Sequence, residues 1–110
     1  MNSNKAGIIT MSRKAGKLVV GMDMVKRACC DAAAAAVFVT KDLSEKSFKE
    51  VRFTCGRYNV KLYRLDMTMD DMDLTMGKRT GVVAMTDRGF ARSCAKDLEE
   101  IGTDNNKSES

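Results

Sequence analysis

The sequence contains no histidine, and only 5% of its 110 residues are aromatic. The absence of histidine removes the commonest general base of enzymes and the usual nitrogen ligand of metal ions. The four cysteines form no Cys-x-x-Cys pair, which disfavours both zinc and thioredoxin-like sites; they are Cys29, Cys30, Cys55 and Cys94. Because no nucleophile–base pair can be assembled, we expect a protein that is not an enzyme and needs neither a cofactor nor a metal ion.

Long apolar runs are missing as well. The sequence has no run of about 18 apolar residues that could cross a membrane, and it does not open with the pattern of a signal peptide. Glycine-rich phosphate-binding fingerprints of the GxGxxG or GxxxxGK[ST] type are also absent. We therefore expect a cytoplasmic protein with reduced, mostly packed thiols and no membrane partner.

The sequence is moderately basic. The formal net charge is +4, from 19 lysines and arginines against 15 aspartates and glutamates. This balance permits a nucleic-acid partner without demanding one. The length suits a single domain, which we place at residues 1–101, and the polar segment 102–110 is expected to be a disordered tail.

Apolar periodicity and cap residues predict alternating helices and strands. We expect strands at 18–20, 35–40, 61–65 and 82–86, and helices at 2–16, 21–31, 44–57, 68–76 and 88–101. Ser3, Thr68, Asp87 and either Asp42 or Ser44 are the expected N-caps. On the first helix, Ile8, Met11 and Ala15 share the apolar spacing. The order indicates an α/β fold, a three-layer α/β/α sandwich whose central four-stranded sheet carries helices on both faces.

A basic stretch around two glycines organises the chain. Gly16 suits the left-handed position just past a helix end, and Gly21 lets the backbone turn sharply where the second helix begins. A helix N-terminus beside several cations is a ready anion site, because its unpaired N–H groups and its dipole favour negative charge. The cations of this stretch are Arg13, Lys14, Lys17, Lys26 and Arg27, and phosphate is the obvious anion.

Three stretches carry a resemblance to a known family: RKAGKLVVGMDMVKRA, VFVTKDLSEKS with CGRYNVKLYRL, and MGKRTGVVAMTDRGFA. Together they resemble the kink-turn RNA-binding ribosomal proteins, the L-seven-Ae / L-thirty-e superfamily, and most of all its small bacterial YlxQ-type members. The resemblance covers the chain from about residue 6 to residue 95. It implies a three-layer α/β/α domain that binds structured RNA, either ribosomal RNA or a kink-turn-like, sharply bent stem with tandem G·A pairs. It also makes the ribosome an expected partner.

In that family the RNA-binding motif begins at a glycine, with Asn two residues later, Glu three later and Lys six later. Gly21 matches the glycine and Arg27 matches the basic position, whereas Asp23 replaces Asn and Met24 replaces Glu. The resemblance implies that these side chains face guanine edges. Met24 cannot accept a strong hydrogen bond, and Asp23 lacks the amide donor. We therefore expect phosphate binding to persist while base readout is weakened.

The resemblance also implies a second contact in the loop after the last strand, residues 85–89, which lies against an extruded nucleotide in the family. The turn before this strand keeps Gly77 but has Asp73 where the family has its first glycine. The expected RNA-contact residues are Lys14, Lys17, Gly21, Asp23, Met24, Lys26, Arg27, Lys78, Arg79, Met85, Thr86, Asp87 and Arg88.

Simpler interpretations compete with each of these signals. The lysines could be solvated helix faces, and the methionines of segment 67–76 are better explained as core filler than as a binding groove. The aspartates at 70–73 favour a helix N-terminus over a metal site because the helix dipole already stabilises them. The alternative function is a protein–protein interaction module on the same fold that has lost specific RNA binding. The salt dependence of binding distinguishes the two functions, since RNA binding weakens steeply as salt is added and binding through an apolar protein interface does not.

Overall fold

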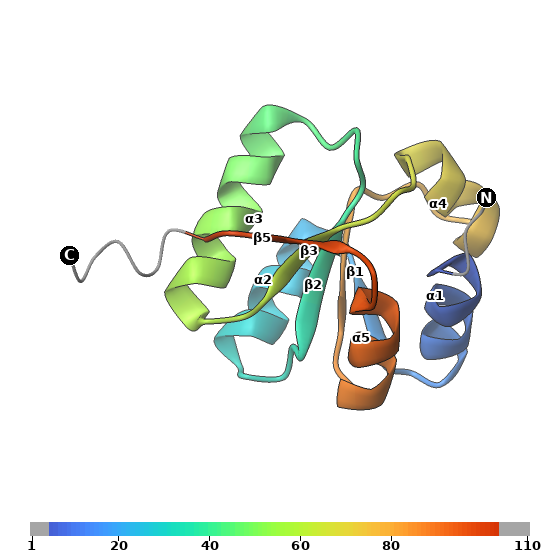
Figure 1. The fold of residues 1–110 in the computed structure, drawn as a ribbon, viewed down its shortest axis with the longest axis horizontal. Helices are drawn as coiled ribbons and strands as arrows, with labels where there is room; N and C mark the ends of the chain where they lie inside the picture. Colours follow the sequence, from blue (N-terminus) through green and yellow to red (C-terminus); the bar gives the residue numbers. More distant parts are fainter. Residues whose placement is uncertain (1–4, 104–110) are drawn as a thin grey trace.

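Helices and strands alternate along the chain in the computed structural model, which describes residues 5–103 (Figure 1). The elements are α1 (Lys5–Lys14), β1 (Leu18–Val20), α2 (Met22–Cys30), β2 (Ala36–Val39), α3 (Glu45–Tyr58), β3 (Leu62–Arg64), α4 (Met69–Met76), β4 (Val82–Met85), α5 (Arg88–Ala95) and β5 (Glu99–Ile101). Among residues 5–103 there is no helix of the length and apolar character that a membrane crossing requires.

One sheet joins all these strands in the order β1-β4-β2-β3-β5. Strands β2 and β3 run parallel, while β4 is antiparallel to both β1 and β2, and β5 is antiparallel to β3. Every residue of the central strands β2 and β4 is buried. Burial of both faces explains their continuous apolar sequences, because a strand covered on both sides has no polar face to show.

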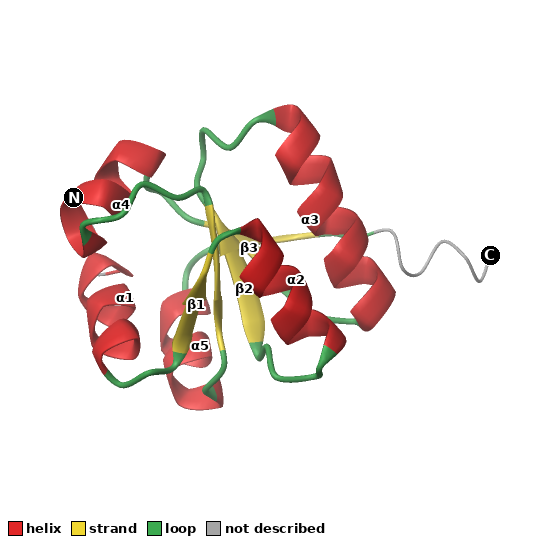
Figure 2. Ribbon diagram, turned by 180° about the vertical axis from the view of Figure 1, so that it is seen from behind, coloured by secondary structure: helices red, strands yellow, loops and turns green. Residues whose placement is uncertain are grey.

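Helices cover both faces of the sheet, which confirms the three-layer α/β/α sandwich. Helices α2 and α3 pack together on one face, and α1 packs with α4 and α5 on the other (Figures 1 and 2). Alternation along β2 feeds two separate cores: Val37 and Val39 face α2 and α3, while Ala36 and Phe38 face the other layer.

The sheet has five strands rather than the four expected from the sequence, because the last helix ends early. Helix α5 was predicted to reach residue 101 but ends at Ala95, and Asp97 turns the chain with a φ of 66°. The chain then returns as β5, which pairs Glu99 with Arg64 and Ile101 with Leu62. Ile101 packs into the core beneath α2 and α3. Its apolar spacing continued the helical pattern, so only the tertiary pairing distinguishes strand from helix here.

The buried face of α1 also differs from the prediction. Ile9 and Ser12 are fully buried, whereas Met11 is 57% exposed and Ala15 is exposed. Ser12 can be buried because its hydroxyl donates a hydrogen bond of 2.9 Å to the carbonyl of Ile9. The expected start of this helix at residues 2–4, with its Ser3 cap, lies outside the described residues, as does most of the expected tail.

Helix termini follow the cap predictions closely. The Ser44 side chain caps α3, whereas Asp42 instead accepts a hydrogen bond from the backbone of Met69. Thr68 and Asp71 form a reciprocal capping box at the start of α4, and Gly77 ends that helix with a φ of 75°. Ser44 and Thr68 thus mark where two loops end, and Gly77 marks where the next loop begins.

Candidate nucleic-acid interface

Strand pairing places most of the predicted contact residues in two groups, one at each end of β1. Because β1 and β4 are antiparallel, the N–H of Gly21 donates to the carbonyl of Val82 at one end of β1, and that of Thr86 donates to the carbonyl of Lys17 at the other. We call the first group the α2 end: Gly21, Asp23, Met24, Lys78 and Arg79. We call the second the α5 end: Lys14, Lys17, Thr86, Asp87 and Arg88. Lys17 and Gly21 are four strand residues apart, or about 13 Å at about 3.3 Å per residue.

At the α2 end, Gly21 starts helix α2 in a conformation that other residues rarely adopt. Its φ is 97° and its ψ is 152°, a region populated almost entirely by glycine. No side chain caps α2, so the N–H groups of its first turn point outward without a side-chain acceptor. By contrast, side chains cap α3, α4 and α5. The first turn of α2 can therefore accept an anion from solution.

The two positions that depart from the family motif lie on the surface of that same turn. Met24 is 55% exposed, and Asp23 is exposed as well. Neither side chain is needed for the core, so both are available to a ligand. The Asp23 carboxylate places a negative charge beside the anion-binding N–H groups, which weakens their attraction for phosphate.

The loop between α4 and β4 brings Lys78 and Arg79 to this end. A Cβ at Gly81 would lie 2.5 Å from Cδ1 of Leu43, so this loop packs closely on the loop that follows β2. Arg79 Nε lies 3.0 Å from Asp70 Oδ1 in α4. Lys78 is exposed and makes no ion pair with any residue between 5 and 103. The loop thus offers one free and one partly neutralised cation.

The two cations farther along α2 are engaged in ion pairs. Lys26 Nζ lies 2.6 Å from Glu50 Oε2 on α3, and Arg27 Nε lies 3.5 Å from Asp31 Oδ2. The hydrogen bond and charge of Glu50 raise the pKa of Lys26, while Lys26 lowers the pKa of Glu50. A phosphate at either position must compete with a carboxylate that is already there.

The family resemblance placed Met85 on the RNA surface, whereas the structure buries its side chain. Met85 is 0% exposed and packs in the core with Phe38. In the loop that follows, Asp87 Oδ2 accepts the N–H of Phe90 at 2.9 Å and so caps α5. Arg88 is exposed. The methionine was misjudged because it ends a strand whose residues are all buried.

Lys41 was missed by sequence reasoning and lies at the α2 end. It directly follows β2, its N–H donates to the carbonyl of Met67, and its Nζ lies 3.3 Å from Asp66 Oδ1. The parallel pairing of β2 with β3 brings these loops together. The position of Lys41 directly after a strand could identify it as a contact residue only once the strand order showed which end of the sheet it occupies.

Between residues 5 and 103 the thiols and carboxylates show no arrangement suited to metal binding. The described residues contain no group of three or more potential metal ligands from His, Cys, Asp and Glu. Cys29, Cys55 and Cys94 are buried, while Cys30 is exposed. Burial raises the pKa of the Cys94 thiol to about 12, so it stays protonated near neutral pH.

The fold and this surface define a small α/β/α protein with an uncapped, glycine-started helix beside a basic loop. The chain is 32% identical over 85 residues to the RNA-binding protein YlxQ of Bacillus subtilis, covering 76% of this chain and 84% of that protein. It is 29% identical over 99 residues to the RNA-binding protein YlxQ of Enterococcus faecium, covering 89% and 95% respectively. The chain therefore belongs to the YlxQ family.

Two further comparisons complete these findings. No protein-family model matches the chain. A solved structure of a protein of unknown function from Bacillus halodurans superimposes with a TM-score of 0.77 at 20% identity, covering 86% of this chain and 95% of that one. At this identity the likeness shows the fold alone.

Proposed function

We propose that this protein is a non-enzymatic RNA-binding protein that holds the backbone of structured RNA at the α2 end. The observation that carries the proposal is the uncapped first turn of α2 behind Gly21, in a chain whose YlxQ relatives are named RNA-binding proteins. The RNA is of the kink-turn type bound by the L-seven-Ae / L-thirty-e superfamily, or a ribosomal RNA segment, and the ribosome is a partner.

A phosphate is held by the backbone N–H groups of residues 22–24, with Lys78 and Arg79 supplying charge from the neighbouring loop. The helix dipole and the outward N–H groups act together on the anion. Lys26 and Arg27 lie one turn farther along α2, where their ion pairs reduce their contribution. Lys14, Lys17 and Arg88 contribute to the positive field from the α5 end.

Base readout at this surface is weak. The exposed Asp23 and Met24 cannot together offer the donor and acceptors that guanine edges require. Phosphate contacts position a protein on RNA but carry no sequence information. The protein therefore binds structured RNA with more affinity than selectivity.

A groove between α2 and α3 favours a second candidate function, the binding of a protein partner. Phe53 is 58% exposed beside Tyr58 and Cys30 in this groove. Exposed aromatic side chains in a concavity are typical of interaction sites. Such a partner would bind through apolar contacts and show little dependence on salt.

The test is binding of the purified protein to a kink-turn RNA and to a plain duplex of equal length over a range of salt concentrations. The proposal predicts binding whose log K falls linearly with log salt concentration, because phosphate contacts release counterions. Exchange of Lys78 and Arg79 for Gln should lower the affinity for both RNAs, whereas exchange of Lys46 and Lys49 on α3 serves as a charge-matched control. Absence of binding to both RNAs at low salt would favour the protein-partner function.

A further inference from the structure

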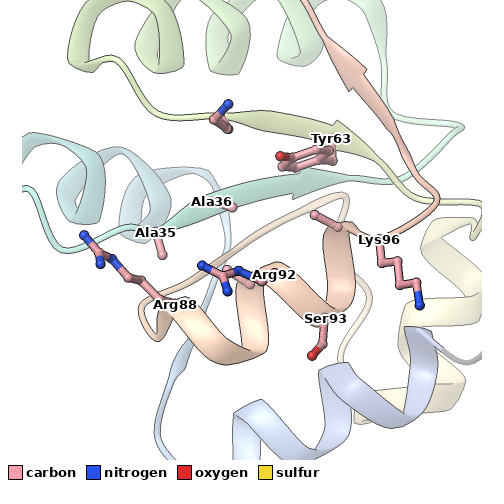
Figure 3. A pocket seen from close by; sticks show the side chains of 10 residues that line it. Ala35, Ala36, Tyr63, Arg88, Arg92, Ser93 and Lys96 are labelled. Carbon is pink, nitrogen blue, oxygen red and sulfur yellow. The ribbon is translucent and has the colours of Figure 1, made fainter.

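A basic pocket lies on the face of the sheet away from α2 and α3, between α5 and the strands β2 and β3 (Figure 3). It has a volume of about 720 Å³ and is open to solvent. Small-molecule sites in proteins span about 300–1,000 Å³. Alanines on both walls, such as Ala36 and Ala91, leave this space unfilled.

Cations surround this pocket, which we call the α5 pocket. Arg88, Arg92 and Lys96 follow one another at four-residue spacing along α5 and just past its end, and Lys61 lies across the pocket beside β3. Within residues 5–103, Arg88, Arg92 and Lys96 make no ion pair. Lys61 lies 3.9 Å from Glu100 and is only loosely paired. The pocket therefore carries positive charge that the rest of the described chain leaves uncompensated.

Arg88 is unfavourably placed on α5 unless an anion is bound. Like charges four residues apart on a helix repel one another. Arg88 also stands in the first turn of α5, where the positive end of the helix dipole disfavours a cation. Arg92 lies in the last turn of α5 and Lys96 at its C-cap, where the helix dipole favours cations. Arg88 is the member of the row that the helix does not favour and that a bound anion would stabilise.

The remaining wall of the pocket is aromatic. Tyr63 is half-buried and lines the cavity opposite α5 (Figure 3). Its ring stacks on Phe38 with 5.5 Å between ring centroids and 21° between ring planes, which holds it in one orientation. A fixed aromatic ring beside several cations is how proteins bind nucleotides of a single strand, since bases contact the ring and phosphates contact the cations.

We propose that the α5 pocket binds a nucleotide of a single-stranded RNA segment, with its base against Tyr63 and its flanking phosphates on Arg88 and Arg92. The nature of the polymer rests on the proposed function, although the pocket itself is separate from the α2 end. Guanidinium groups suit this role because their planar fork binds phosphate oxygens in pairs. The protein then holds structured RNA on one layer and an adjoining single strand on the other.

The test compares binding of a fluorescein-labelled eight-nucleotide uridine RNA by three proteins. These are the parent, the Arg88→Gln/Arg92→Gln variant, and the Lys46→Gln/Lys49→Gln variant, which loses the same charge from α3. We expect the arginine variant to lose roughly tenfold or more in affinity, and its salt slope to fall by about 1.4, or about 0.7 for each lost phosphate contact. The control should change less than about twofold. Equal effects of the two variants would overturn the proposal.

Photo-crosslinking identifies the residue that meets the base. A 4-thiouridine version of the same RNA should cross-link to the peptide that contains Tyr63, and Arg88→Gln/Arg92→Gln should reduce the yield. Cross-links confined to other peptides would contradict the proposal. Equal affinity for free uridine monophosphate and the eight-nucleotide RNA would overturn it in favour of a free-nucleotide site.

Failure of this proposal is distinguishable from failure of the proposed function. The Lys78/Arg79 variant with kink-turn RNA reports on the α2 end, and the Arg88/Arg92 variant with the single strand reports on the α5 pocket. A protein that binds kink-turn RNA while its Arg88/Arg92 variant binds the single strand as the parent does would overturn the pocket proposal alone.

Discussion

Helices α2 and α5 differ in whether a side chain caps their first N–H groups and in whether their cations form ion pairs. Helix α2 leaves its first N–H groups uncapped behind Gly21, while Lys26 and Arg27 beyond them are engaged in ion pairs. Helix α5 is capped by Asp87, while Arg88, Arg92 and Lys96 along its pocket face make no ion pair within residues 5–103. We therefore propose that backbone groups dominate anion binding at the α2 end and that side-chain charge dominates it in the α5 pocket.

Disturbing the backbone of the α2 end should have the largest effect. Gly21→Ala forces a residue with a Cβ into a glycine-only conformation, so we expect about 1–3 kcal/mol of lost stability together with weaker RNA binding. Gly7→Ala is the matched control, because Gly7 lies within α1 with open space around it and should gain about 0.5–1 kcal/mol. Chemical denaturation measures both. Unchanged stability of Gly21→Ala would show that the turn relaxes without strain.

Restoring the family side chains at the α2 end should sharpen its selectivity. Asp23→Asn combined with Met24→Glu supplies the amide donor and carboxylate acceptors for base edges, and both positions are exposed, so stability should change little. A good base contact contributes about 1–3 kcal/mol of discrimination. We expect the preference for kink-turn RNA over duplex to rise roughly tenfold, which corresponds to about 1.4 kcal/mol. An equal rise for both RNAs would show that only the removed negative charge matters.

Removing a side-chain cap should cost less and leave RNA binding at the α2 end intact. Asp87→Ala removes the acceptor for the Phe90 N–H and should cost about 1 kcal/mol. Thermal unfolding measures the loss, and kink-turn RNA binding is the control. A matching loss of kink-turn affinity would mean that the two ends are not independent.

The capping box of α4 adds a pH dependence with a defined sign. Hydrogen bonds from Thr68 hold the pKa of Asp71 below its usual value. The carboxylate therefore stabilises the fold above its unfolded pKa of about 3.9, and this contribution is lost as the pH falls through the lower folded value. Asp71→Asn should lower stability at neutral pH and flatten the dependence below about pH 4. Parallel pH profiles for the parent and Asp71→Asn would contradict this assignment.

Single cations flanking the two ends should show the smallest effects. Lys17→Ala and Arg27→Ala each remove at most one phosphate contact, so the salt slope should fall by about one unit or less. Both side chains are exposed, and stability should stay within about 0.5 kcal/mol. Because Arg27 is paired with Asp31, we expect the weaker effect there. Parent-like binding by both variants would exclude these cations from the contact surface.

Local signals in the sequence predicted most elements, because caps and glycines act over a few residues. Strand β1, the caps Ser44, Thr68 and Asp87, and the left-handed Gly16 with a φ of 74° all lie where expected. Strand β5 was missed because a three-residue edge strand is defined by its partner β3 rather than by its own pattern.

The site was harder to predict because it depends on strand order. A single basic stretch of sequence holds Lys17 and Gly21, yet β1 separates them to its opposite ends. Arg92, Lys96 and Tyr63 formed no motif at all, since the α5 pocket unites a helix with a strand about 30 residues earlier. The family resemblance assigned Met85 to the surface, although the continuous apolar run of β4 is typical of a strand buried on both faces.

Mapping backbone amide shifts as kink-turn RNA is added tests the central claim most directly. If the α2 end holds phosphate through backbone groups, the largest shifts should fall on the amides of Met22, Asp23 and Met24, with smaller ones at Lys78 and Arg79. The capped turn of α5 should respond less to this RNA. Shifts concentrated on the groove around Phe53 and Tyr58, with residues 22–24 unchanged, would contradict the account.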